Sequence, residues 1–155
     1  SSLIARAEER KTLTAMALLD SAIVAYEEGL GKKISLSPLA QQPNVLGGGP
    51  LLMQNGNVVL NGRQEGFSPG FMSLAAPRTV VAQGPSGQWL MTLRGAAGSD
   101  PTLVETALAA QQLGLRDALN MDGGSSTTLV VAGRTVMNGR SSTPRVHNGL
   151  GLIPL

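Results

Sequence analysis

The sequence Asp122-Gly123-Gly124 lies between two β-prone runs and constrains the fold more than any other part of the chain. A mostly apolar run at 118–121 precedes it, and hydroxyl side chains followed by a second apolar run occupy 125–131. An Asp-Gly pair between two such runs is a strong signal for a hairpin turn. The same arrangement delivers one carboxylate to a strand end, beside glycines whose backbone reaches conformations closed to other residues. The local pattern is therefore compatible with two interpretations, a structural turn and a functional site.

Twenty glycines and nine prolines divide the chain into short elements joined by tight turns. The predicted strands are 32–36, 58–60, 79–83, 88–93, 118–121, 127–131, 135–138 and 146–153. Asn55-Gly56 predicts one hairpin turn and Ala132-Gly133 another. Residues 15–26 fit either a buried helix or two short strands, and 62–77 lack periodicity, which predicts a long ordered loop.

The clearest helix signal begins near Thr102. This residue suits an N-cap, and Glu105 completes a capping box with it. Pro101 fits a first helical turn, and Gly114 ends the pattern. One such helix among strands, followed by the strand before Asp122, predicts an α/β (α+β) fold with a mixed, largely antiparallel sheet and few helices. The candidate site is expected at strand ends.

Composition narrows the function classes. At 155 residues and 42% hydrophobic content, the chain suits one domain with a genuine core. A net charge of +2, without a basic cluster rich in aromatics, predicts no nucleic-acid partner, and no apolar run reaches the roughly 18 residues of a membrane span. Zero cysteines and one histidine argue against thiolate zinc sites and histidine-rich metal centres. No cofactor is predicted, although a carboxylate with carbonyl groups leaves Ca²⁺ or Mg²⁺ open.

Familiar catalytic motifs are missing from the sequence, which leaves acid or base chemistry by a carboxylate. There is no Gly-x-x-x-x-Gly-Lys phosphate loop and no Gly-x-Ser-x-Gly elbow. Gly47-Gly48-Gly49 does not fit a dinucleotide fingerprint, because Pro50 blocks the expected helix. Among the ten acidic residues, Asp122 alone stands at a glycine hinge. Glycosidases normally use two carboxylates, so Glu65 or a residue outside this chain is a candidate partner.

Four ordered features between residues 45 and 153 point to one family. The first is the turn Gly48-Gly49-Pro50 with Asn55-Gly56, and the second is the strand start Pro77-Arg78-Thr79. The third is the helix over 102–113, followed by the run Leu119-Asn120-Met121-Asp122-Gly123-Gly124-Ser125-Ser126-Thr127. The fourth is the closing segment 145–151. Together they resemble the phosphodiester glycosidase family, whose signature is Asn-Leu-Asp-Gly-Gly-x-Ser. One departure matters, because the family's upstream Asn-Gly-Gly-Phe-Phe type motif has no counterpart before residue 45. We therefore expect the C-terminal part of a longer domain, or a reduced variant, and contact with a missing N-terminal half.

The resemblance implies hydrolysis of a sugar-1-phosphodiester, with N-acetylglucosamine as the family's sugar. It implies a general acid/base or hydroxyl-binding role for Asp122 and a phosphate-binding role for Arg78. Because free aspartate is ionised at neutral pH, action as an acid requires burial. The implied substrate-binding residues are Gly48, Gly49, Arg94, Gly123, Gly124, Ser125, Ser126, Arg145 and Asn148. Backbone N–H groups of the four glycines are candidate donors to phosphate oxygens, whereas an isolated His147 is expected to be structural.

Other readings stay open at this point. The main alternative is a non-catalytic glycan- or cell-wall-binding module with the same cleft, and a third is a scaffold in which the glycine turn only connects strands. We expect residues 1–44 to be a segment of the same domain, without a resolved pattern of its own, and 45–155 to be the glycosidase-like core. A periplasmic or extracellular enzyme acting on exopolysaccharide or cell-envelope glycans is the expected context.

Overall fold

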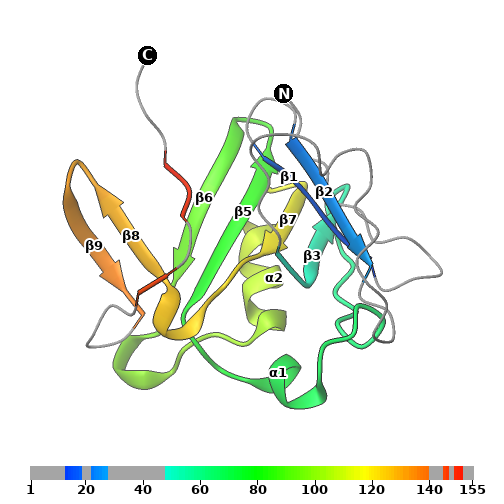
Figure 1. The fold of residues 1–155 in the computed structure, drawn as a ribbon, viewed down its shortest axis with the longest axis horizontal. Coiled ribbons are helices and arrows are strands. Elements are labelled where there is room, and N and C mark those ends of the chain that lie inside the picture. The colour runs from blue at the N-terminus through cyan, green and yellow to red at the C-terminus, as the bar shows by residue number, and fades with distance from the viewer. Residues whose placement is uncertain (1–12, 19–21, 28–47, 140–144, 147–148, 152–155) are drawn as a thin grey trace.

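The computed structural model describes residues 13–18, 22–27, 48–139, 145–146 and 149–151 (Figure 1). The strands are β1 (Leu13–Leu18), β2 (Ala22–Glu27), β3 (Leu51–Gln54), β4 (Asn57–Val58), β5 (Arg78–Gly84), β6 (Gly87–Leu93), β7 (Asp117–Asn120), β8 (Thr128–Val131) and β9 (Arg134–Asn138). The largest sheet has five strands in the order β4-β3-β7-β5-β6, and β1–β2 and β8–β9 form separate hairpins. Every pair among these described strands is antiparallel, which confirms the predicted fold class.

Turn residues set the hairpins where the sequence predicts them. Asn55 and Gly56 both have positive φ, 50° and 82°, between β3 and β4. Two successive positive φ values characterise the turn whose twist matches the flanking strands. Ala132 and Gly133 show the same pattern, 49° and 75°, between β8 and β9. These local signals therefore fix the register of both hairpins.

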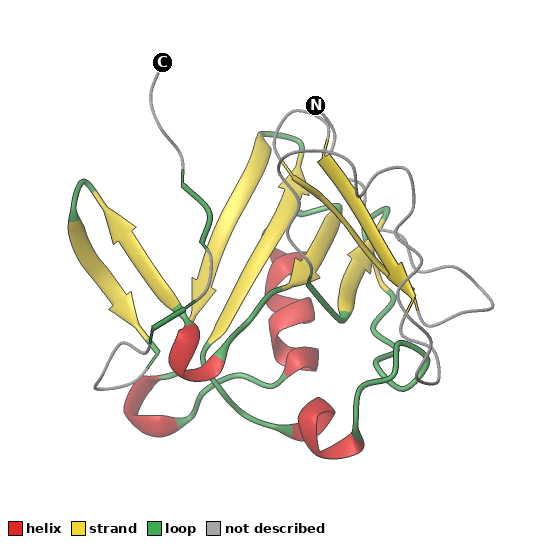
Figure 2. Cartoon of the chain, in the orientation of Figure 1, coloured by secondary structure: helices red, strands yellow, loops and turns green. Residues whose placement is uncertain are grey.

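The core lies between the five-stranded sheet and helix α2 (Leu103–Gln112), which runs behind the sheet in Figure 2. The helix contributes Leu103, Ala107 and Ala110, all fully buried. Val80 and Ala82 of β5 meet them from the sheet, as do neighbours on β3 and β7. Burying one leucine side chain contributes about 1.5–3 kcal/mol. The helix therefore packs against the middle strands of the sheet and shares one core with them.

Two predicted elements differ from the structure. Residues 62–77 contain a short helix, α1 (Pro69–Ser73), which a loop prediction omitted. Ser68 caps α1 by accepting the Phe71 N–H, a signal too short to give a helical period. The predicted strand at 146–153 is wrong for its described positions, 146 and 149–151, which are not in a strand. Of the two alternatives for 15–26, the described positions 15–18 and 22–26 form strands, whereas the strand predicted at 32–36 lies outside the described residues.

A capping box opens α2, as the sequence predicts. Thr102 Oγ1 accepts the Glu105 N–H at 3.3 Å, and Glu105 Oε2 accepts the Thr102 N–H at 2.8 Å. Hydrogen bonds from Thr102, first from its backbone and then from its hydroxyl, lower the pKa of Glu105. A lowered carboxyl pKa gives stability that is present above the unfolded value and is lost as the pH falls through the folded value. The capping box therefore stabilises α2 at neutral pH and loses part of this effect in acid.

We expect Thr102→Ala to lower the free energy of unfolding by about 1 kcal/mol at neutral pH, because the helix loses its N-cap. Equilibrium urea denaturation measures this difference. Part of it should disappear in acid, where Glu105 is protonated in both proteins. Thr135→Ala, exposed on β9, is the control. An equal loss in both variants would contradict a specific capping role.

Within the described part of the chain, no helix combines the length and apolar character needed to cross a membrane.

Candidate functional site

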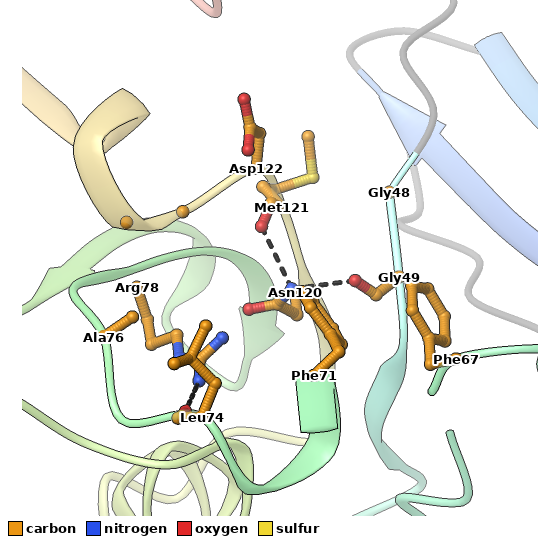
Figure 3. A pocket seen from close by; sticks show the side chains of 12 residues that line it. Gly48, Gly49, Phe67, Phe71, Leu74, Ala76, Arg78, Asn120, Met121 and Asp122 are labelled. Carbon is orange, nitrogen blue, oxygen red and sulfur yellow. Dashed lines mark hydrogen bonds between the residues drawn. The ribbon is translucent and has the colours of Figure 1, made fainter. Parts of the chain in front are cut away.

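A cleft of about 330 Å³ opens at one end of the five-stranded sheet (Figure 3). Strand β7 lies between β3 and β5 and is antiparallel to both, so its carboxyl end meets their amino ends. The segments before β3, before β5 and after β7 therefore converge. The residues that line the cleft are Gly48, Gly49, Phe67, Phe71, Leu74, Ala76, Arg78, Asn120, Met121, Asp122, Gly123 and Gly124.

The hinge after β7 carries Asp122 at the cleft. Its backbone is anchored on both sides, because the Met121 N–H donates to Thr79 O at 2.8 Å and the Gly124 N–H donates to Pro77 O at 2.7 Å. A Cβ atom on Gly123 would lie 2.8 Å from Pro77 O, closer than real Cβ contacts allow. Asp122 itself is exposed. The anchored backbone thus presents an accessible carboxylate at the cleft.

The turn at residues 48–50 forms the opposite wall. Its Gly49 N–H donates to Asn120 O at 2.7 Å, and the Gly49-Pro50 peptide is cis. A Cβ on Gly48 would lie 2.8 Å from both Asn120 O and the Met121 sulfur, so the close approach requires glycine. Of the four predicted phosphate donors, the amides of Gly49 and Gly124 already donate to protein carbonyls.

Arg78, at the start of β5, is 2% exposed and lines the floor of the cleft. Its Nε donates to Pro101 O at 3.2 Å and its Nη2 donates to Leu74 O. The guanidinium carbon lies 5.9 Å from the centre of the Phe71 ring. Burial lowers the pKa of Arg78 from its ordinary value, and the nearby Asp100 carboxylate partly offsets this effect. Arginine stays protonated in proteins, so the cleft has a cationic floor.

The sequence prediction missed four lining residues with evident roles in shaping the cleft. Phe67 and Phe71 stack with ring centres 5.1 Å apart, on the loop predicted at 62–77. They are the only two phenylalanines of the chain, and that clustering was the available signal. Asn120 and Met121 stand in the signature run but were assigned no role. Asn120 is 1% exposed and donates two side-chain hydrogen bonds.

A wider groove of about 640 Å³ adjoins the cleft and shares Met121 and Asp122 with it. Two residues predicted to bind substrate, Ser126 and Arg145, line this groove rather than the cleft. Asp122 therefore lies where the two hollows meet.

Two further predicted residues, Arg94 and Ser125, lie away from the cleft. Arg94 is exposed and its Nη1 donates to Asn138 O at 2.8 Å, so it is not among the cleft-lining residues. Ser125 is exposed and lines neither hollow, and Asn148 is outside the described residues, as is His147.

Glu65, the suggested second carboxylate, does not line the cleft. It is 3% exposed, and both carboxylate oxygens accept the Leu51 N–H, at 3.1 and 3.2 Å. That contact fixes the start of β3. Among the described lining residues, Asp122 is thus the only acid. The described part of the chain also contains no group of three or more His, Cys, Asp or Glu side chains suited to a metal ion.

A sequence profile of the phosphodiester glycosidase family matches residues 3–153. The chain belongs to the phosphodiester glycosidase family. This match begins at residue 3, so it covers the N-terminal segment as well as the motifs between residues 45 and 153. A search of curated proteins gave no match.

Two solved structures are similar to this phosphodiester glycosidase family member. A hypothetical protein from Synechocystis shares 35% identity with a TM-score of 0.58, over 72% of this chain and 22% of that one. The zebrafish N-acetylglucosamine-1-phosphodiester alpha-N-acetylglucosaminidase catalytic domain, auto-inhibited by its pro-peptide, shares 20% identity with a TM-score of 0.49, over 59% and 34%. The chain thus spans about a fifth to a third of these relatives' lengths.

Proposed function

We propose that the chain forms part of an enzyme that hydrolyses a sugar-1-phosphodiester at the cleft. One observation carries this proposal: Asp122, Arg78 and the 48–50 turn, far apart in sequence, line the same 330 Å³ hollow. A carboxylate and a guanidinium in one cleft suit a ligand that has both hydroxyls and an anionic phosphate. Family membership favours the same reaction class.

The chemistry of the leaving group explains how one exposed carboxylate is sufficient. Breaking the bond between the sugar C1 and its oxygen releases a phosphate monoester, whose second pKa is about 6. Such a group leaves at neutral pH without being protonated by an acid. The remaining task is activation of water, which adds its oxygen to C1 and gives up a proton. We assign this general-base role to Asp122 and neutralisation of the phosphate to Arg78.

Hydrolysis in H₂¹⁸O tests the proposal with a methyl diester of N-acetylglucosamine 1-phosphate as the probe. We expect the full-length protein to place ¹⁸O on the C1 hydroxyl of the released sugar, detected by mass spectrometry. Cleavage of the phosphorus–oxygen bond would instead place ¹⁸O in the phosphate product. That outcome would show a phosphodiesterase activity and would contradict the proposed glycosidase activity.

A glycan- or cell-wall-binding module is the second candidate. The observation that favours it is the lone acid of the described cleft lining, since most glycosidases use two carboxylates. Binding of a glycan by the full-length protein, without release of sugar under any condition, would select this reading. The finer expectations of an exopolysaccharide or cell-envelope substrate, and of a periplasmic or extracellular location, stay predictions.

A further inference from the structure

Asn120, the last residue of β7, joins the two walls of the cleft. Its side-chain Nδ2 donates to Gly49 O at 2.7 Å and to Met121 O at 3.0 Å. Its backbone adds two bonds to the same turn, because the Asn120 N–H donates to Pro50 O at 3.2 Å and Asn120 O accepts the Gly49 N–H at 2.7 Å. One residue thus connects the glycine turn with the peptide that carries Asp122.

The orientation of this amide follows from its partners. Both nearby groups are backbone carbonyls, which only accept hydrogen bonds, so the NH₂ group faces them. The other atom, Oδ1, is buried without a partner among the described residues, and Figure 3 shows it on the side of Arg78. The unpaired buried oxygen costs folding stability. The two bonds that Nδ2 donates offset this cost, because they satisfy the carbonyls of Gly49 and Met121.

We propose that Asn120 is the positioning residue of the cleft, fixing the 48–50 turn against the hinge of Asp122 so that a ligand meets both walls at a set spacing. The role in turnover rests on the proposed function, whereas the role in holding the turn does not. Reacting groups misplaced by about 1 Å lose up to about 100-fold in rate. Asn120 acts through Gly49 and Met121 and needs no contact with the reacting atoms.

Asn120→Asp tests the proposal, because it keeps the size and Oδ1 and replaces the donating NH₂ group with an oxygen that carries a charge when ionised. An ionised carboxylate has no hydrogen to donate to Gly49 O or Met121 O, whereas a protonated carboxyl donates to one of them. Burial raises the pKa of the new carboxyl, whereas the guanidinium of Arg78 in the same cleft lowers it. The donor returns once the pH falls below the resulting value. We expect the turnover of the variant to be about tenfold below that of wild type at pH 8. The ratio of variant to wild-type turnover should rise as the pH falls.

Hydrogen exchange at the Gly49 amide, followed by NMR, gives a readout without substrate. Protection at Gly49 should fall in Asn120→Asp at pH 8 and recover in acid, whereas it stays unchanged in Asn57→Asp. Asn57 is a matched control, since its exposed side chain also donates to a backbone carbonyl, Asn55 O at 3.3 Å, away from the cleft.

If Asn120→Asp does not fold, Asn120→Ser keeps one hydroxyl donor and should show reduced Gly49 protection at every pH. Wild-type protection at Gly49 in the folded variants overturns the proposal. A wild-type protein that cleaves nothing overturns the proposed function alone, because the exchange experiment still decides the role of Asn120.

Discussion

Replacing Asp122 with asparagine is expected to lower turnover of a sugar-1-phosphodiester at least about 100-fold, the lower end for loss of a general base. The side chain is exposed and lies where the cleft and the groove meet, so asparagine fits without a change in packing. It keeps an acceptor for sugar hydroxyls but does not take a proton from water. The loss should therefore appear in kcat, with a smaller change in KM, in steady-state kinetics.

Asp117→Asn is the matched control, because Asp117 stands at the other end of β7. Its Oδ1 accepts the Asn55 N–H at 3.0 Å, a bond that asparagine retains. We expect its turnover within about twofold of wild type, as for surface substitutions that cost under about 0.5 kcal/mol. Unchanged turnover in Asp122→Asn would remove Asp122 from the mechanism. Equal losses in both variants would indicate a general effect of charge removal.

The sequence predicted those parts of the fold that depend on neighbours in the chain. Asn55-Gly56 and Ala132-Gly133 adopt positive φ because of their own chemistry, and the hairpins follow from it. The capping box of Thr102 and Glu105 spans only three residues. Such signals hold whatever packs around them. Together with the apolar runs between the turns, they predicted the six strands β4 to β9 and helix α2.

The convergence of the cleft walls followed from the sequence only through the family resemblance. Gly49 and Asn120 are 71 residues apart and meet because β7 pairs with β3. Pairing between distant strands leaves no local signal, so the contacts of Asn120 were missed although the residue stood in the signature. For the same reason Glu65 was suggested as a catalytic partner, whereas its carboxylate binds the Leu51 N–H.

Arg78 gives the largest expected effect on stability, because its buried guanidinium donates to two part-buried backbone carbonyls. Arg78→Met keeps much of the side-chain length and leaves Leu74 O and Pro101 O without their donors. A hydrogen bond to a charged group contributes about 1.5–3 kcal/mol. Because both acceptors are only part-buried, we expect the free energy of unfolding to fall by about 2–4 kcal/mol in urea denaturation. Arg94→Met is the control, since its single bond to Asn138 O is at the surface and should cost less than about 1.5 kcal/mol.

Arg78→Lys separates the structural role of Arg78 from its proposed role toward phosphate. Lysine keeps the charge over Phe71 but has no planar fork to reach both carbonyls. If Arg78 also binds the phosphate, Arg78→Met should raise KM by about tenfold or more, because a charge-assisted hydrogen bond of about 1.5–3 kcal/mol is lost. Arg78→Lys should retain part of the affinity for substrate that Arg78→Met loses. Equal KM values for folded Arg78→Met and wild type would confine Arg78 to holding Leu74 and Pro101. The phosphate would then require another cation, and Arg145 in the adjoining groove is the first to substitute.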